Sequence, residues 1–205
     1  LRANQVGAAG WTAIANALEG ITSLTSLNGC ALYPVIRAGG IAELQLEPAT
    51  ELCIAVARYL PRSASTLTKL DLRSNALGPG GGTAVAGVLE LLTVLGSLDL
   101  RANQVGAAGW TAIANALEGI TSLTSLNGCA LYPVIRAGGI AELQLEPATE
   151  LCIAVARYLP RSASTLTKLD LRSNALGPGG GTAVAGVLEL LTVLGSLDLR
   201  ANQVG

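Results

Sequence analysis

The chain has 205 residues, of which half are hydrophobic and 3% are aromatic, and its 13 basic and 14 acidic residues give a formal net charge of −1. This balance provides no positive field, so it disfavours nucleic acid and anionic membrane surfaces as partners. No apolar run approaches the roughly 18 to 20 residues of a membrane-spanning helix. Because so few residues are aromatic, small aliphatic side chains must build the core.

An exact internal repeat organises the sequence. Residues 100–198 copy residues 1–99, and residues 199–205 begin a third copy, so the period is 99 residues. Any site must therefore occur about twice. We predict a single solenoid over residues 1–205, without the polar caps that usually close the ends of repeat arrays.

Shorter repeats appear within the period when the leucines are aligned. Residues 67–77 follow the pattern LxxLxLxxNxL, and residues 95–105 follow it again 28 residues later. Apolar and polar residues alternate over residues 70–73, which is typical of a strand with one buried face. Each repeat therefore predicts one strand of a parallel sheet, with the leucines pointing inward.

A glycine-rich segment, residues 78–83, follows the first of these strands. Phosphate-binding loops also lie between a strand and a helix. This segment lacks the lysine of GxxxxGK[ST], and Thr83 stands where GxGxxG needs a glycine. We interpret it as a tight turn packed against its neighbours, because glycine tolerates unusual backbone angles.

Helices are predicted after the glycine-rich segment. Val85, Leu89 and Leu92 lie at i, i+4 and i+7, on one face of a helix, and residues 113–120 repeat this spacing. Trp110 lies on the apolar face of the second helix, one repeat after Gly82. We expect its ring to fill the space beside that glycine, although tryptophan is also common at binding sites.

The next repeat is short, because only 17 residues separate Leu126 from Leu143. That length cannot hold a strand, a helix and two connections. We predict extended chain with at most one helical turn; the alternative is a single 43-residue repeat with an insertion. After the strand that begins at Leu143, a helix over residues 150–158 should stop before Pro160.

These repeats resemble the ribonuclease-inhibitor-like leucine-rich repeats in both pattern and spacing. The resemblance implies an α/β solenoid, an arc with a parallel β-sheet on its concave face, helices on its convex face and one short irregular repeat per period. It also implies a ladder of asparagines such as Asn75, whose side chains satisfy the turning backbone. Members are usually intracellular protein-binding scaffolds, so we expect a cytoplasmic location. The chain begins at Leu1 rather than Met, so the sequence leaves open whether a targeting signal precedes it.

No catalytic, cofactor or metal site is predicted. Histidine is absent, so serine nucleophiles lack a base and cysteines lack a partner for a mixed metal site. The cysteines at 30, 53, 129 and 152 have no CxxC spacing, and we interpret them as buried structural thiols, with a disulfide or a reactive nucleophile as alternatives. We therefore expect no enzyme activity and no cofactor.

The outward side chains of the predicted sheet form the candidate partner-binding surface. Adjacent strands lie about 4.8 Å apart, so Asp71 should neighbour Asp99, and diagonal pairing with arginines should relieve the like charges. A self-satisfied, solvated face is the alternative. The candidate residues are Lys69, Asp71, Arg73, Asp99, Arg101, Asn127, Gln144, Glu146, Lys168, Asp170 and Arg172.

Two functions follow from these observations. The first is a non-enzymatic scaffold that binds a protein partner through the repeat surface. The second is a structural, assembly or linker element, either a segment of a longer array or a piece that associates head to tail with its own copies.

Overall fold

The computed structural model describes residues 7–28, 30–46, 53–146 and 152–203. The chain divides into two compact units, an N-terminal unit (Leu1–Leu123) and a C-terminal unit (Thr124–Gly205). Each unit is treated by itself. A single solenoid over residues 1–205 therefore stays a prediction.

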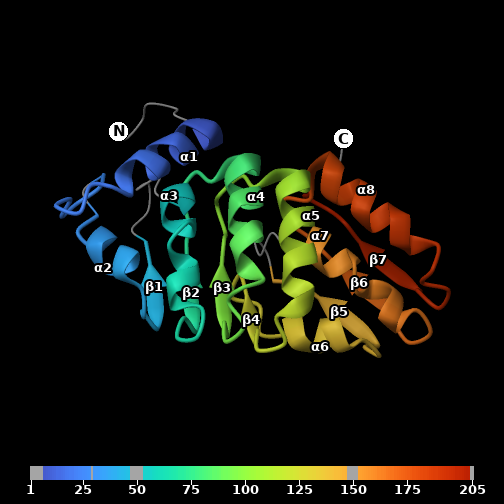
Figure 1. The fold of residues 1–205 in the computed structure, drawn as a ribbon. Coiled ribbons are helices and arrows are strands. Elements are labelled where there is room, and N and C mark those ends of the chain that lie inside the picture. Colours follow the sequence, from blue (N-terminus) through green and yellow to red (C-terminus); the bar gives the residue numbers. More distant parts are fainter. Residues whose placement is uncertain (1–6, 29, 47–52, 147–151, 204–205) are drawn as a thin grey trace. The chain divides into compact units, whose positions relative to one another are not determined.

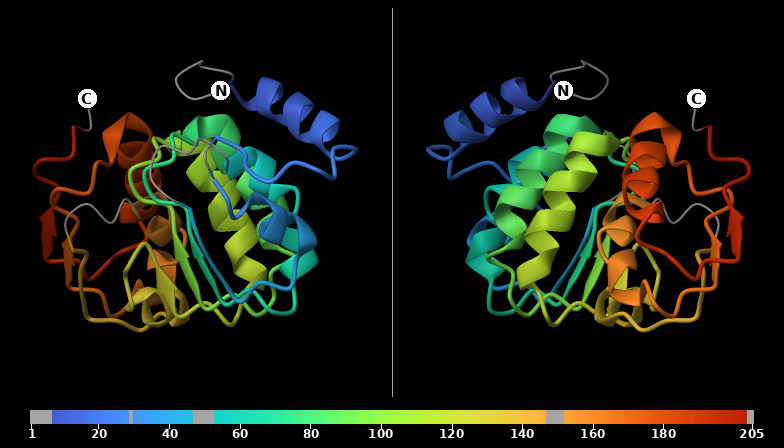
Figure 2. Two further views of the ribbon diagram at one scale, coloured as in Figure 1. Left: turned by 90° about the vertical axis from the view of Figure 1, so that its left-hand side faces the viewer. Right: turned by 90° about the vertical axis from the view of Figure 1, so that its right-hand side faces the viewer.

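The N-terminal unit alternates helices and short strands (Figure 1). Strands β1, β2 and β3 are parallel and hydrogen-bonded in chain order. Figure 2 shows these strands in one layer and helices α4 and α5 in a second layer beside it. The elements are α1 (Gly7–Leu18), α2 (Tyr33–Ala38), β1 (Glu43–Gln45), α3 (Cys53–Ala57), the 3-10 helix η1 (Leu60–Ser63), β2 (Lys69–Asp71), α4 (Gly78–Leu89), β3 (Ser97–Asp99), α5 (Gly106–Ala116) and the 3-10 helix η2 (Leu117–Gly119).

The C-terminal unit repeats this alternation. Strands β5, β6 and β7 are parallel and hydrogen-bonded in chain order. The elements are β4 (Ser125–Leu126), α6 (Tyr132–Ala137), β5 (Glu142–Gln144), α7 (Cys152–Ala156), the 3-10 helix η3 (Leu159–Ser162), β6 (Lys168–Asp170), α8 (Gly177–Leu188) and β7 (Ser196–Asp198). Parallel strands joined through helices in both units confirm the predicted α/β solenoid-like fold.

The leucines of the repeat pattern build the core of each unit. Leu70 and Leu72 are fully buried on β2 and just after it, and Leu98 and Leu100 are fully buried in the next repeat. Burial of one such side chain contributes about 1.5–3 kcal/mol relative to exposure. The predicted burial of the strand leucines is thus confirmed.

The predicted asparagine ladder is present where the chain leaves the strands. The fully buried Asn103 side chain accepts a 2.8 Å hydrogen bond at Oδ1 from the backbone N–H of Asn75, and its Nδ2 donates to the Leu72 carbonyl at 2.8 Å. Asn202 holds the backbone of Asn174 in the same way, also at 2.8 Å. One side chain therefore satisfies buried backbone groups of two neighbouring repeats.

The glycine-rich segment is helical, so the prediction of a tight turn is wrong. Residues 78–83 form the start of α4, where Pro79 supplies the preset φ of a first helical turn. A Cβ built at Gly82 would lie 2.5 Å from Val105 Cγ1 and 3.2 Å from Gly109 Cα. Gly82 is therefore explained by the close approach of α4 and α5, whereas Gly78 has the left-handed φ of 58° that glycine tolerates.

Trp110 is buried on α5, with 5% of its side chain exposed, as predicted for a core residue. The atoms nearest to a Cβ at Gly82 belong to Val105 and Gly109. The packing of the indole ring beside Gly82 stays a prediction.

The short repeat contains more helix than predicted. α6 has six residues, about one and two-thirds turns, and its counterpart in the first copy, α2, has the same length. Pro133 lies in the first turn of α6, and Tyr132 and Ile135 are buried beneath it. The Tyr132 ring packs edge-on against Tyr158, with centroids 6.0 Å apart. In this repeat, the buried tyrosine rings thus contribute to the core where other repeats have a longer helix.

The hydrogen-bonded sheet does not pass through this short repeat. β5 opens the sheet β5–β6–β7, which does not contain β4. On its other side β5 has the register of an ordinary repeat strand, with Leu143 opposite Leu169. This register favours a short repeat over an insertion. The following helix, α7, ends at Ala156 and so before Pro160, as predicted; residues 150 and 151 of the predicted helix lie outside the described part of the chain.

Candidate functional site

The candidate site is the sheet face, defined as the solvent-facing side of β1–β3 and of β5–β7 with the residues that directly follow those strands. In the N-terminal unit, Asp71 lies directly opposite Asp99 across the β2–β3 pair. Asp170 lies opposite Asp198 in the C-terminal unit. The predicted alignment of aspartates on neighbouring strands is confirmed.

Arginines relieve the repulsion between these aspartates. Arg73 Nη2 lies 2.8 Å from Asp71 Oδ2, and Arg73 Nε lies 3.5 Å from Asp99 Oδ2 on the next strand. Arg101 Nη2 in turn lies 2.6 Å from Asp99 Oδ2. The diagonal pairing expected from the sequence is confirmed, and the four side chains form an alternating row of two negative and two positive charges.

Two candidate aspartates are not on the surface, which corrects the sequence prediction. Asp71 is 7% exposed and Asp170 is 6% exposed. Each accepts a 3.1 Å hydrogen bond from the backbone N–H two residues later, of Arg73 and Arg172 respectively, and the arginine side chain pairs with it. These carboxylates therefore hold the arginines in place.

The arginines are the exposed part of this row. Side chains of Arg73 and Arg172 are 44% and 45% exposed, and that of Arg101 is 35% exposed. The hydrogen bonds that Arg73 donates to the Asp71 carboxylate raise the pKa of Arg73, and the hydrogen bond from Arg200 lowers the pKa of Asp198 to about 2. The face therefore presents fixed guanidinium groups whose charge is locally balanced.

The remaining exposed candidates flank the row. Lys69 lies 3.6 Å from Glu43 and Lys168 lies 3.7 Å from Glu142, with all four side chains at least half exposed. Such exposed pairs contribute at most about 1 kcal/mol, so they leave both lysines able to exchange partners. Gln144 and Glu146 are exposed on and after β5 as predicted.

Asn127 does not belong to the sheet face. Its side chain is fully buried, and its φ of 50° is left-handed. The chain turns here because β4 ends at Leu126, which bridges back to Cys129. Asparagine tolerates this conformation better than most residues. Asn127 aligns with Asp99 of the preceding repeat, which suggested an outward side chain. That inference required β4 to continue through residue 127.

Sequence reasoning missed several residues of the sheet face. Glu43 and Gln45 lie outward on β1, with Gln45 opposite Asp71, and Asp198 and Arg200 extend the charged row in the C-terminal unit. The exact period was the available signal, because Gln45 is the first-copy counterpart of the predicted Gln144.

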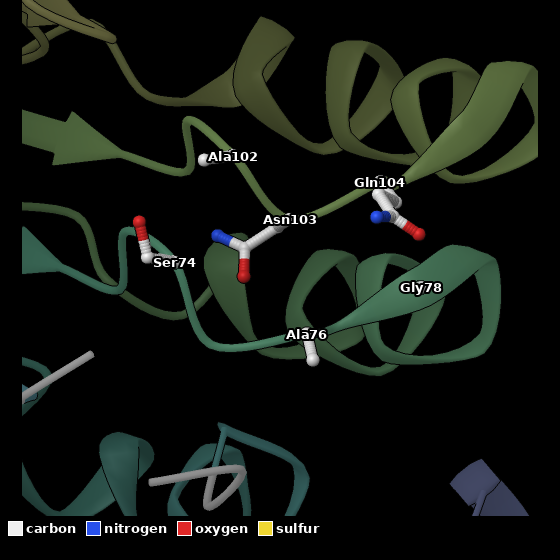
Figure 3. A pocket seen from close by; sticks show the side chains of 6 residues that line it. All are labelled: Ser74, Ala76, Gly78, Ala102, Asn103 and Gln104. Carbon is white, nitrogen blue, oxygen red and sulfur yellow. The ribbon is translucent and has the colours of Figure 1, made fainter. Parts of the chain in front are cut away.

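A small open pocket of about 240 Å³ lies at the end of the strands, beside the sheet face (Figure 3). It is formed by the turns that follow β2 and β3, whose residues alternate into left-handed conformations, such as Ala76 at φ 53° and Gln104 at φ 51°. No charged side chain lines it, and the asparagine amide is engaged in the ladder. The lining residues are Ser74, Ala76, Gly78, Ala102, Asn103 and Gln104.

Cysteine and acidic side chains were predicted to form no metal site. No group of three or more potential metal ligands is found in the described part of the chain. Cys30 and Cys129 are free and half-buried rather than fully buried as predicted, and burial raises the pKa of the Cys129 thiol. The side chains of the other two cysteines lie outside the described part of the structure.

The family described as "Leucine Rich repeat" matches residues 63–86 and 162–185. These segments contain β2 with most of α4 and β6 with most of α8, the repeats that carry the leucine core and the asparagine ladder. These two segments resemble leucine-rich repeats. Such repeats generally mediate protein–protein interaction and are typically non-enzymatic. No curated protein matches the chain in sequence. None of the described helices is long and apolar enough to cross a membrane.

Proposed function

We propose that this leucine-rich-repeat chain is a non-enzymatic interaction module of the ribonuclease-inhibitor-like type, which binds a protein partner through the sheet face. The observation that carries the proposal is the clamped position of Arg73. Its guanidinium is held by the buried Asp71 on one side and approaches Asp99 on the other, yet 44% of its side chain is exposed.

Clamping matters because a flexible arginine loses conformational entropy on binding. Immobilising such a side chain on binding costs about 0.5–1.5 kcal/mol. Arg73 and its copy Arg172 are already held in the unbound chain, so binding immobilises them at a smaller cost. Both arginines keep an exposed planar group that can stack or donate hydrogen bonds to a partner. The exposed members of the proposed binding face are Lys69, Arg73, Arg101, Gln144, Glu146, Lys168 and Arg172.

The same geometry argues for recognition rather than simple charge attraction. Each arginine is paired with a carboxylate, so the row carries no net charge and would not attract acidic molecules in general. A protein surface that offers carbonyl oxygens or aromatic rings at matching positions is the partner chemistry that fits. No nucleophile, base and oxyanion donor meet at this face, which supports a role without catalysis.

A cytoplasmic location accompanies the proposal. It is supported by the thiols of Cys30 and Cys129, which are free in the structure, because reducing compartments keep thiols in this form.

The test compares two charge-reversed variants as bait. Lys69→Glu with Lys168→Glu changes the sheet face in both copies, and Glu90→Lys with Glu189→Lys changes exposed residues beyond the ends of α4 and α8. All four positions are exposed, so both variants should fold like the wild type. Captured proteins are quantified by mass spectrometry and then tested in purified form by calorimetry.

A partner that binds the wild type and the Glu90/Glu189 variant, but loses at least about tenfold affinity for the lysine variant, supports the sheet face. Arg73→Glu with Arg172→Glu should weaken binding further. The proposal fails if the purified partner binds both sheet-face variants as tightly as the wild type.

A further inference from the structure

Three arginines of the N-terminal unit converge on one residue, Glu19, which follows the C-terminal end of α1. Arg58 donates a hydrogen bond to one carboxylate oxygen of Glu19, and Arg62 Nη2 lies 4.0 Å from the other oxygen. Arg37 Nη2 donates a 2.6 Å hydrogen bond to the backbone carbonyl of Glu19. We call Arg37, Arg58 and Arg62 the arginine cluster. Its members lie on α2, directly after α3 and on η1, so they belong to helical elements and not to the sheet face.

The end of α1 holds two of these guanidinium groups. Arg37 Nη1 donates a 2.6 Å hydrogen bond to the Ile21 carbonyl, just beyond the helix, where unpaired carbonyls favour a cation. α1 packs against α3 (Figure 1), which brings Arg58 to the last turn of α1. There Arg58 donates a hydrogen bond to the side-chain oxygen of Asn16. Both arginines are therefore positioned before any ligand binds.

The third guanidinium group, that of Arg62, is held by α2 and by an aromatic ring. It lies 5.0 Å from the centroid of the Tyr59 ring, in a cation–π contact, and donates a hydrogen bond to the Arg37 carbonyl. Gly39 permits this approach, because a Cβ at that residue would lie 2.5 Å from Arg62 Cβ. The close contact between the end of α2 and η1 thus places Arg62 beside Arg37.

The arginine cluster carries more positive than negative charge. Its three guanidinium groups share one carboxylate, that of Glu19, which leaves two positive charges unbalanced. The other basic side chains in the described part of this unit are each paired with a carboxylate of their own; they are Lys69, Arg73 and Arg101. Among the described residues of the unit, excess positive charge therefore gathers at the cluster.

The Glu19 carboxylate is a replaceable partner for these arginines. Its side chain is 50% exposed, and the side chains of Arg58 and Arg62 are 37% and 45% exposed. Ion pairs with this exposure contribute little to stability, because water and salt screen them. An anion from solution can therefore reach the same guanidinium groups and take the place of the carboxylate.

The second copy of the sequence places its arginines in the same way within the C-terminal unit. Arg161 lies 4.9 Å from the centroid of the Tyr158 ring and donates a hydrogen bond to the Arg136 carbonyl. Arg136 is half-buried, whereas Arg157 and Arg161 are exposed, as are their counterparts in the first copy. The arrangement of these arginines is therefore a property of the repeat.

We propose that the arginine cluster binds a phosphate monoester, which displaces the carboxylate of Glu19. A phosphate monoester carries a charge of about −1.5 to −2 at pH 7, so it matches the two unbalanced positive charges, whereas one carboxylate leaves a positive charge over. Its terminal oxygens also suit the paired N–H donors of guanidinium groups. This proposal does not rest on the function proposed for the sheet face.

A single phosphate group fits this cluster better than a polyanion does. Nucleic acid binding depends on contacts with many phosphates, which the chain's net charge of −1 does not favour. The phosphate group can belong to a phosphorylated side chain of a protein or to a small molecule. Both offer the same chemistry to the arginines, so the experiment includes a probe for each source.

The experiment measures binding to the 205-residue chain by isothermal titration calorimetry. The probes are inorganic phosphate and a short phosphoserine peptide, and the same peptide with an unmodified serine is the control. Each substitution is made in both copies, because the sequence repeats exactly. The variants are Arg58→Gln with Arg157→Gln, Glu19→Gln with Glu118→Gln, and the matched control Glu90→Gln with Glu189→Gln, which removes two exposed carboxylates outside the cluster.

The wild type should bind the phosphoserine peptide and not the serine peptide. The arginine variant should bind it at least about tenfold more weakly, because a charge-assisted hydrogen bond is lost. The Glu19/Glu118 variant should bind it about three- to fivefold more tightly, because the competing carboxylate is gone. The Glu90/Glu189 control should bind like the wild type. A gain of affinity is informative, since misfolding cannot produce it.

Two further comparisons characterise the ligand. Tighter binding of the phosphoserine peptide than of inorganic phosphate identifies a phosphorylated protein segment as the source, and equal binding identifies a small phosphate compound. Binding of either probe should weaken as the pH falls from about 7.5 to about 5, because the phosphate group takes up a proton near pH 6 and loses charge.

Three results would overturn the proposal. The first is a wild type that binds neither phosphate probe at concentrations up to about 10 mM. The second is a serine peptide that binds as tightly as the phosphoserine peptide. The third is an affinity that changes neither in the arginine variant nor in the Glu19/Glu118 variant, which would place the bound phosphate elsewhere on the chain.

Discussion

Asn103 Oδ1 accepts a 2.8 Å hydrogen bond from the backbone N–H of Asn75, so a side chain of one repeat completes the backbone of the repeat before it. The same side chain donates to the Leu72 carbonyl at 2.8 Å. Because Asn103 is fully buried, no water can replace it. The ladder therefore couples the folding of neighbouring repeats.

Replacement of this asparagine should be costly. Asn103→Ala leaves the N–H of Asn75 and the carbonyl of Leu72 buried without their side-chain partner, so we expect a loss of about 2–4 kcal/mol in the free energy of unfolding. Urea denaturation followed by circular dichroism measures this loss. The control is Gln104→Ala at the exposed neighbouring position, which should change stability by less than about 0.5 kcal/mol. Equal effects of the two substitutions would contradict the ladder's role.

Two glycines of α4 should respond in opposite directions to alanine. A Cβ at Gly82 would meet Val105 at 2.5 Å, so Gly82→Ala should destabilise the chain by about 1–3 kcal/mol. Gly87 has no neighbouring atom within 4 Å of such a Cβ, so Gly87→Ala should stabilise the helix by about 0.5–1 kcal/mol. Thermal unfolding of the two variants provides the comparison, and a stabilising effect at Gly82 would refute the close helix contact.

The turn after β2 stores strain that glycine should relieve. Ala76 has a φ of 53°, a left-handed conformation that costs an alanine about 1–2 kcal/mol. Ala76→Gly should therefore raise the free energy of unfolding by about 0.5–1 kcal/mol after the entropy cost of glycine is included. Ala84→Gly, within α4, should lower it by about 1 kcal/mol. Chemical denaturation of both variants checks these signs.

Asp198 provides a pH-dependent test of the charged row. Its hydrogen bond from Arg200 lowers the pKa to about 2, below the unfolded value near 3.9. A depressed pKa means that the stabilisation is present above about pH 4 and is lost as the pH falls towards 2. Arg200→Gln should move the pKa of Asp198, measured by carboxyl NMR titration, back towards 3.9. Lys168→Gln, whose charge is paired with Glu142, should leave that pKa unchanged.

Local patterns sufficed to predict the strands, and the family resemblance implied the ladder. The alternation around Leu70 and the recurrence of Asn75 depend on the repeat itself, so the register that places Asp71 opposite Asp99 followed from counting residues. Features that depend on a neighbouring repeat were not predictable in this way. Gly82 was interpreted as a turn glycine. A glycine is needed there because Val105 of the next repeat approaches it, and the local sequence does not show that contact.

The candidate site was predicted in outline and wrong in two physical details. Asp71 was expected at the surface, but the pairing with Arg73 covers it, and no sequence pattern records that side-chain conformation. Asn127 was expected to face outward, but the strand ends one residue earlier and the chain turns. The first error concerns the placement of a side chain, and the second concerns the path of the backbone.

The central claim is that each repeat depends on its neighbour to bury its leucines, and Leu98 and Leu197 test it within one chain. The two residues have identical local sequence, yet the first is fully buried and the second is 40% exposed. Denaturant unfolding at low protein concentration should show a loss of about 3–5 kcal/mol for Leu98→Ala and less than about 1.5 kcal/mol for Leu197→Ala. Equal losses for the two variants would contradict the account.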